Sequence, residues 1–414
     1  MEKNNGVLSG IRVLDMADEY GVYCTKLMAQ MGAEVIKVEP LDGDSTRRIG
    51  PFAQDDSKSL EKSLFHAFYN EGKKSITLDY ARPEGREVFL RLVRQADVLV
   101  ETFEPGRMKE LGLDYPVLKE VNPKLVMCSI TPFGQEGPYS HYRASSDMVP
   151  FAMTGPMMEY GDPEREPLQL GQNILANGAG MVALAGISAV LYAREEDGQG
   201  DFVSVSLSEV AGTWRNMALG IPQMSPEHKP FIRMGSQGSF IPANYYKCKD
   251  GYVFIMASGK WAQCAKWLKD VGIDIGDKDD PKYLEDAGYN KYLWADADQV
   301  NEMMSELSLM YTKKDMMEEG QRRGVPVGTS ETPDTVMQNE HFIARKMFHT
   351  VDSPAVGAYQ TVAPGCTFSG MDTYAEEPAP LLGADNAEIF AAAGLTWEEI
   401  GRLQKAGIIG GEVS

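Results

Sequence analysis

The sequence predicts an α/β fold in which helices cover both faces of a parallel sheet. Short apolar runs typical of buried strands occupy 11–16, 34–38, 75–78, 98–100 and 125–130. Between two of these runs, 84–95 carries apolar residues at helical spacing. Strands that alternate with helices form βαβ units, so the sheet is expected to be parallel and buried. The organisation is Rossmann-like, although no GxGxxG motif follows the first strand and a dinucleotide is not indicated.

A long apolar helix and one more strand are expected to complete the first part of this large domain. Residues 178–194 are rich in Ala and Gly and read as a buried helix. The polar segment 195–200 then forms a turn, and 202–207 alternates as a half-buried strand does.

The middle of the chain predicts a smaller α+β domain inserted into the large one. Pro, Gly, Met and Tyr become prominent from about 223, and Asp250-Gly251 predicts a hairpin over 245–257. Charged helical patterns follow, and an amphipathic helix is expected at 396–406, near the end of the chain. We therefore expect a small domain over 223–330, with the large domain formed by 1–222 and 331–414.

Composition excludes several classes of function. A net charge of −20 argues against a nucleic-acid partner. The five cysteines contain no CxxC pair and the histidines no HxxxH pair, which argues against a metal site and for a reducing cytoplasm. No stretch resembles a signal peptide, and none approaches the roughly 18 unbroken apolar residues of a membrane span. A cytoplasmic protein without a membrane or metal partner is expected.

Several long segments carry a resemblance that runs in order through nearly the whole chain. They are LSGIRVLDM (8–16), MGAEVIKVEPLDGDSTR (31–47), NEGKKSITLDYARPEGR (70–86), ADVLVETFEPGRMKELGLDY (96–115), NPKLVMCSITPFGQEGP (122–138), GISAVLYAREEDGQGDFVSVSLSE (186–209), YYKCKDGYVFI (245–255) and APLLGADNAEIFAAAGLTWEEIGRLQKAGII (379–409). These segments are similar to family III CoA-transferases, the family of formyl-CoA transferase and carnitine-CoA transferase.

The resemblance implies both a fold and a reaction. Members have a Rossmann-like large domain built from both ends of the chain and a small inserted domain, and two chains interlock as a dimer. They move CoA from a donor thioester to an acceptor carboxylate. An aspartate attacks the thioester carbonyl and carries the reaction through a mixed anhydride and an aspartyl-CoA thioester. CoA and acyl-CoA are therefore substrates rather than covalently bound cofactors, and a homologous subunit is the expected partner.

The nucleophile of the family is missing from this chain. In the family the aspartate stands four residues before a glycine of the long helix; here that glycine is Gly180, and Ala176 stands four residues earlier. The run 167–181 holds no Asp or Glu. One interpretation is a degenerate subunit whose partner supplies the aspartate. The anaerobic benzylsuccinate CoA-transferase, with two related subunits, is the type, and succinyl-CoA with an aryl- or alkylsuccinate would be the substrates.

Three other interpretations stay open at this point. The chain could be an inactivated, Asp-to-Ala form of a homodimeric transferase. It could be an acyl-CoA racemase, because racemases have the same fold and use a His and an Asp; His141 is the only nearby histidine. It could also be a CoA-binding protein without activity.

The turn after the first strand also departs from the family. Members carry a small Gly-Pro loop there, close to CoA, whereas this chain has the shorter acidic run 17–21 with Asp18 and Glu19. Two carboxylates beside a pyrophosphate would repel it by several kcal/mol at low effective dielectric. The same turn could equally be a solvated one.

The resemblance assigns further residues to CoA binding. Thr102 and Phe103 stand beside the pantetheine and adenine, and Asp147 at an acidic position near the active site, where the other interpretation is a helix N-cap. Apart from the resemblance, a phosphorylated ligand would need a basic pocket in this acidic chain; the candidates are Arg47, Arg48, Lys73, Lys74, Arg107 and Arg143, and each could instead be a solvated surface charge. The resemblance also places a glycine-rich loop that shields the intermediate from water at Gly235 and Gly238, where the other interpretation is a plain surface turn.

Overall fold

The computed structural model describes residues 6–56, 58–168, 171, 173–214, 233, 235, 241–257, 259–284, 290–371 and 377–410. The chain forms two compact units. Unit 1 comprises Met1–Pro156, Gln169–Lys229 and Glu340–Ser414, and unit 2 comprises Met157–Leu168 and Pro230–Asn339. The chain therefore leaves unit 1 and returns to it. That the chain folds as separate domains with boundaries at 222 and 330 remains a prediction.

Unit 1 is built on a six-stranded sheet whose strand order is β3-β2-β1-β4-β5-β6. All five pairings are parallel, which confirms the predicted sheet. The strands are short. All except β6 are almost wholly buried, because helices cover the sheet. The strands are β1 (Arg12–Met16), β2 (Glu34–Glu39), β3 (Lys74–Thr77), β4 (Val98–Glu101), β5 (Val126–Thr131) and β6 (Phe202–Ser206).

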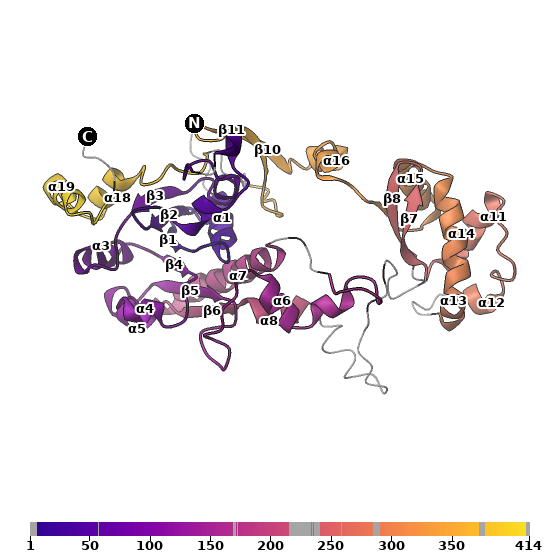
Figure 1. Cartoon of the computed structure of the whole chain (residues 1–414), viewed down its shortest axis with the longest axis horizontal. Coiled ribbons are helices and arrows are strands. Elements are labelled where there is room, and N and C mark those ends of the chain that lie inside the picture. The colour runs from indigo at the N-terminus through magenta and orange to yellow at the C-terminus, as the bar shows by residue number, and fades with distance from the viewer. Residues whose placement is uncertain are drawn as a thin grey trace. The chain divides into compact units, whose positions relative to one another are not determined.

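Helices lie on both faces of this sheet (Figure 1). One side carries α3 (Pro83–Val93), α4 (Arg107–Glu110) and α5 (Tyr115–Val121), and the other carries α1 (Val22–Gln30) and α7 (Ile174–Asp197). α3 begins with a proline, whose missing N–H leaves no donor unsatisfied at a helix start. By length and apolar composition α7 could cross a membrane, but it packs on α1, β5 and β6 as a core helix does.

The C-terminal segment completes the core of unit 1. α18 (Asn386–Ala392) and α19 (Trp397–Lys405) place Phe390 and Ile400 in the same buried cluster as Leu14 and Phe89. α19 begins with a capping box between Thr396 and Glu399, as its amphipathic pattern predicts. The other elements of unit 1 are η1 (Ser45–Arg48), η2 (Ala53–Asp55), α2 (Leu64–Tyr69), α6 (Met148–Met153), α8 (Leu207–Trp214), α17 (Glu340–Ala344), β10 (Phe348–Ser353) and β11 (Gly357–Val362). η3 (Pro156–Glu159) begins in unit 1 and continues into unit 2.

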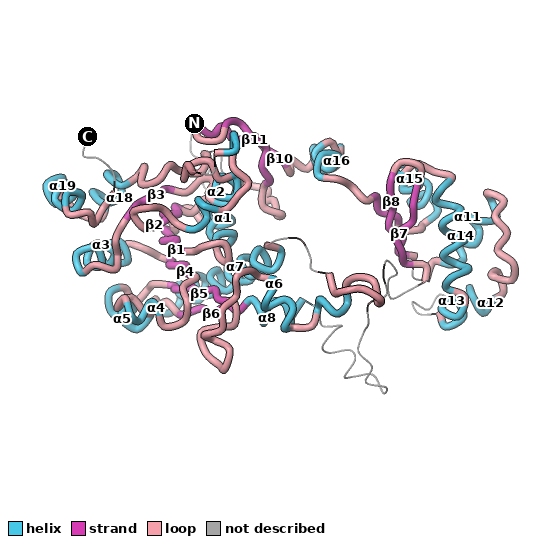
Figure 2. The backbone as a smooth tube through the Cα atoms, viewed as in Figure 1, coloured by secondary structure: helices cyan, strands magenta, loops and turns pink. Residues whose placement is uncertain are grey.

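Unit 2 is a small α+β unit with an antiparallel sheet, coloured by secondary structure in Figure 2. The hairpin predicted at Asp250-Gly251 is confirmed, since β7 (Ala243–Cys248) pairs with β8 (Gly251–Met256). β9 (Val327–Thr329) adds a third strand, and Trp267 and Tyr246 lie in the core. The helices of this unit are α11 (Trp261–Asp270), α12 (Pro281–Leu284), α13 (Lys291–Ala295), α14 (Ala297–Leu309), α15 (Lys313–Arg323) and α16 (Pro333–Met337).

Candidate active site

A pocket lies at the carboxyl ends of the strands of unit 1, where the strand order reverses between β1 and β4. Open α/β sheets bind ligands at this position, because the loops that leave the two central strands diverge to opposite faces. The pocket is lined by the segments that follow β1, β4 and β5, namely 18–20, 102–105, Pro132 and 140–145. This is the candidate active site of the chain.

The turn between β1 and α1 forms one wall of the pocket and is held on both sides. The Asp18 N–H donates to Thr102 Oγ1 over 2.9 Å, and the Tyr20 hydroxyl donates to the Ala144 carbonyl over 2.8 Å. Gly21 is needed here, since a Cβ on it would lie 2.7 Å from Thr102 Cγ2. The turn is therefore fixed against the walls formed after β4 and β5.

Carboxylates outnumber cations in the wall. Asp18, Glu19 and Glu104 line the pocket together with Arg143. Within the described residues, no ion pair or hydrogen bond engages the Arg143 side chain, so its guanidinium is available to a ligand. Burial, and then the neighbouring Glu19, raises the pKa of Asp18 to about 7.

The structure brings three of the predicted site residues together and separates the rest. Thr102, Phe103 and Arg143 line the pocket. Lys74 lies at the opposite, amino end of β3, where it pairs with Glu34 and Glu388, so its position gives it no contact with the pocket.

The remaining predicted ligand residues also lie elsewhere. Arg107 begins α4 and pairs with Glu110 over 2.9 Å rather than lining the pocket. Gly235 belongs to unit 2, where its N–H donates to the Gly161 carbonyl and its φ of 67° favours glycine. Gly238 lies outside the described residues.

The N-terminus of α7 carries Ala176, the position at which the sequence analysis expects the family nucleophile. Ala176 is the third residue of the helix and is only 2% exposed. Asp147 Oδ2 accepts hydrogen bonds from the Leu175 and Ala176 N–H groups, at 3.1 and 3.4 Å. Asp147 thus caps α7, whereas the side chain of the N-cap residue itself, Asn173, makes no capping hydrogen bond.

This helix end lies in the electrostatic neighbourhood of the pocket. Burial raises the pKa of Tyr20, and Glu19, Asp18 and Asp147 raise it further. The Asn177 amide, next to Ala176, accepts a hydrogen bond from the Tyr69 hydroxyl over 3.0 Å. The side chains at 176 and 177 therefore offer a methyl group and an engaged amide, and no carboxylate.

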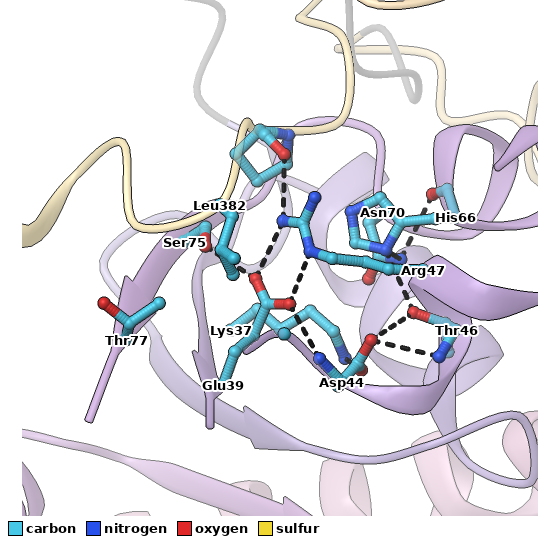
Figure 3. Close-up of polar contacts among 12 residues, drawn as sticks. Lys37, Glu39, Asp44, Thr46, Arg47, His66, Asn70, Ser75, Thr77 and Leu382 are labelled. Carbon is cyan, nitrogen blue, oxygen red and sulfur yellow. Dashed lines mark hydrogen bonds and ion pairs between the residues drawn. The ribbon is translucent and has the colours of Figure 1, made fainter. Parts of the chain in front are cut away.

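A buried polar cluster joins side chains of β2, β3 and η1 (Figure 3). Arg47 holds Glu39 with two hydrogen bonds of 2.6 and 2.8 Å, and Ser75 donates to the same carboxylate. Lys37 pairs with Asp44 at 2.5 Å and donates to the carbonyl of Ala17, in the turn that forms the pocket wall. Through Lys37, the cluster therefore holds the turn between β1 and α1 in place.

Two of the basic residues proposed as phosphate ligands are structural instead. Arg47 is fully buried and engaged with Glu39 and Glu61. Lys73 is fully buried and pairs with Asp15 over 2.8 Å. Sequence reasoning missed Lys37, although a lysine inside the apolar run of β2 is a signal of a buried ion pair. Arg48, more exposed, binds Asp42 and neighbouring carbonyl groups of its own loop.

Comparisons with known proteins agree over the whole length of the chain. The family model described as CoA-transferase family III matches residues 8–386. Succinate–glutarate CoA-transferase of Agrobacterium fabrum is 33% identical over 93% of this chain and 95% of its own. Subunit BbsE of succinyl-CoA:(R)-benzylsuccinate CoA-transferase of Thauera aromatica is 29% identical over 97% and 98%. A CAIB/BAIF family protein of Brucella suis has a similar solved structure, with a TM-score of 0.80, 30% identity, and coverage of 94% of this chain and 100% of that one.

Proposed function

Because the chain belongs to CoA-transferase family III, we propose that it is a cytoplasmic subunit of an enzyme that moves CoA from an acyl-CoA donor to an organic acid. Relatives named for succinyl-CoA, succinate, glutarate and benzylsuccinate support succinyl-CoA as donor and a dicarboxylic acid, such as an aryl- or alkylsuccinate, as acceptor. The pocket at the β1/β4 reversal is the site proposed for CoA, with Thr102, Phe103 and Arg143 as contacts.

One observation carries the proposal that a partner supplies the nucleophile. A methyl group stands at 176, on a buried helix end whose amide groups already bind the Asp147 carboxylate. Thioester exchange needs an ionised oxygen that forms both an anhydride and a thioester. The related chain of a heteromer provides that carboxylate in our proposal, in an interlocked pair of Rossmann-like subunits.

The outer face of α7 supports such a partner. Five exposed apolar residues follow one another at helical spacing in the middle of α7; this α7 stripe comprises Met181, Val182, Ala185, Ala189 and Tyr192. Tyr192 is 80% exposed and Met181 50% exposed. An exposed apolar stripe on a helix that covers the sheet is typical of a surface that is buried in an assembly.

Ala185→Glu is expected to weaken the association of the chain with its partner by about 100-fold or more. An unpaired charge buried in the contact costs about 3 kcal/mol, which is about two factors of ten in the dissociation constant. Analytical ultracentrifugation of the co-purified pair measures the change. Gln199→Glu adds the same charge at an exposed position beyond α7 and should leave association unchanged; equal weakening by both variants would contradict a role for the stripe.

Co-expression tests the proposed division of labour. The chain is produced alone and together with a related family III chain that carries an aspartate at the position equivalent to 176, and each preparation is assayed for CoA transfer from succinyl-CoA to benzylsuccinate. We expect transfer only from the pair, with the CoA adduct on the partner. Transfer by the single chain at the rate of the pair would rule out dependence on a partner.

A further inference from the structure

The charge of the pocket does not match the ligand proposed for it. Coenzyme A carries a diphosphate, and anionic groups are normally bound by arginines, lysines and free N–H groups. Here the wall offers the Arg143 guanidinium against the carboxylates of Asp18, Glu19 and Glu104. A ligand with a diphosphate must therefore enter a site that is already negative.

Asp18 lies in the turn before α1, next to the backbone N–H groups that a diphosphate would need as hydrogen-bond donors. The first N–H groups of a helix attract anions. At the start of α1 the Gly21 and Val22 N–H groups donate to the Asp18 carbonyl over 3.1 and 2.9 Å, and the Tyr20 N–H donates to Asp18 Oδ1 over 3.0 Å. The Asp18 carboxylate thus occupies the Tyr20 N–H, while the backbone carbonyl of the same residue occupies the Gly21 and Val22 N–H groups.

The groups around Asp18 leave its charge weakly compensated. Glu19 follows it on the same turn, Thr102 faces it from the end of β4, and Lys37 faces it from β2. The Lys37 ammonium is already committed to Asp44 and to the Ala17 carbonyl. His141, Arg143 and Glu104 line the opposite walls.

The protonation of Asp18 is accordingly balanced near neutral pH. Burial and then Glu19 raise its pKa to about 7, and the Tyr20 N–H, Thr102 and Lys37 only partly oppose this rise. Its carboxyl group therefore gains or loses a proton close to neutral pH.

Building on the proposed CoA-transferase function, we propose that Asp18 sets the charge selectivity of the pocket: a diphosphate-bearing ligand is admitted when Asp18 is protonated and excluded when it is ionised. Binding of the ligand takes up one proton from solvent, and release returns it. The site favours a CoA thioester in mildly acidic solution. Above neutral pH it favours ligands without a diphosphate.

Calorimetric titration of the full chain with dephospho-CoA tests this inference. The diphosphate of dephospho-CoA keeps its charge between pH 6 and pH 8, so the ligand itself contributes no titration. Because the apparent affinity follows the fraction of chain in the protonated state, the dissociation constant should weaken about tenfold from pH 6 to pH 8. Pantetheine, which has no phosphate, should bind with the same affinity at both values.

Asp18→Asn is the decisive variant. Its amide oxygen can still accept the Tyr20 N–H, and it carries no charge, so dephospho-CoA should bind at pH 8 as tightly as at pH 6. Two controls change other ionisable side chains of this region. His141→Asn alters the pocket wall, and Glu101→Gln alters the side chain that accepts the Phe103 N–H, where burial raises the pKa of Glu101 to about 7. Both should retain the tenfold dependence.

The outcomes separate this inference from the proposed function. Dephospho-CoA binding that stays pH-dependent in Asp18→Asn, or that loses its dependence in a control variant, overturns the role of Asp18 and leaves the CoA-transferase proposal intact. If dephospho-CoA and pantetheine bind to neither the natural chain nor Asp18→Asn at any pH, the pocket is not a CoA site, and the proposed function of this pocket fails together with the inference.

Discussion

Ala176→Asp is expected to give the isolated chain a covalent CoA-transfer step, with a rate on the order of 10³-fold or more above its own background. Residue 176 is the third of α7, where the helix dipole favours a carboxylate, and it is buried from water. With succinyl-CoA, the introduced carboxylate should attack the thioester carbonyl and expel the CoA thiolate, giving a mixed anhydride. The thiolate should then attack the aspartyl carbonyl of that anhydride, so that succinate is released and an aspartyl-CoA thioester remains on the chain. Mass spectrometry of the intact chain and of its peptides locates the adduct.

Two further variants test whether adduct formation by Ala176→Asp comes from the new carboxylate. Ala176→Asn has the same shape without a nucleophilic oxygen and should form no adduct. Asp147→Asn combined with Ala176→Asp removes the nearby charge that now binds the Ala176 N–H, and should raise the rate further. A folded Ala176→Asp chain that binds dephospho-CoA without forming an adduct contradicts the assignment of 176 to the nucleophile. Full activity without a partner would favour the inactivated-homodimer interpretation over the heteromer.

Lys73→Met is expected to destabilise unit 1 by about 3–5 kcal/mol, because it strands a buried carboxylate. Lys73 Nζ lies 2.8 Å from both Asp15 Oδ2 and Thr25 Oγ1 and 2.9 Å from Asn70 Oδ1. After the change the nearest cation is Lys37, 4.0 Å from Asp15. Urea titration followed by hydrogen exchange of β1 and β3 peptides measures the loss within unit 1.

The neighbouring residue is a matched control. Lys74→Met removes a lysine whose ion pairs are partly exposed, so the cost should be about 1 kcal/mol or less. Equal losses at 73 and 74 would contradict the importance of the buried pair.

The effect of Lys73→Met should also depend on pH in a defined direction. Burial would raise the pKa of Asp15, but Lys37 and Lys73 outweigh burial and lower it. A carboxyl group with a lowered folded pKa stabilises the fold above its unfolded pKa, and this contribution is lost as pH falls through the folded value. The difference between Lys73→Met and the natural chain should therefore shrink in acid.

The sequence predicted the sheet of unit 1 well, because its strands are buried on both faces and read as apolar runs. The helix ends were less certain: α7 was expected from 178 but begins at Ile174. Its start depends on Asp147, which is distant in sequence and caps the helix through space. Local patterns do not contain such a contact.

The site was predictable only in part for the same reason. Thr102 and Phe103 follow a strand directly, so their position at its carboxyl end follows from the topology. The basic residues predicted the phosphate contacts less well, since nothing in the sequence distinguishes a buried, paired Arg47 or Lys73 from the partly exposed Lys74. Which of them is available depends on acidic partners that only the fold brings near, such as Glu39, Asp15 and Glu388.

The return of the chain to unit 1 has a consequence for its synthesis. The outer strand β3 is held by residues from the far end of the chain: the Thr77 N–H donates to Asn386, 309 positions later, and the Asp79 N–H donates to the Ile408 carbonyl. A ribosome therefore releases β3 long before the residues that close it exist. Until the segment 386–408 has been synthesised, this strand border stays open to pairing with other nascent polypeptides, so unit 1 closes only after α18 and α19 have formed.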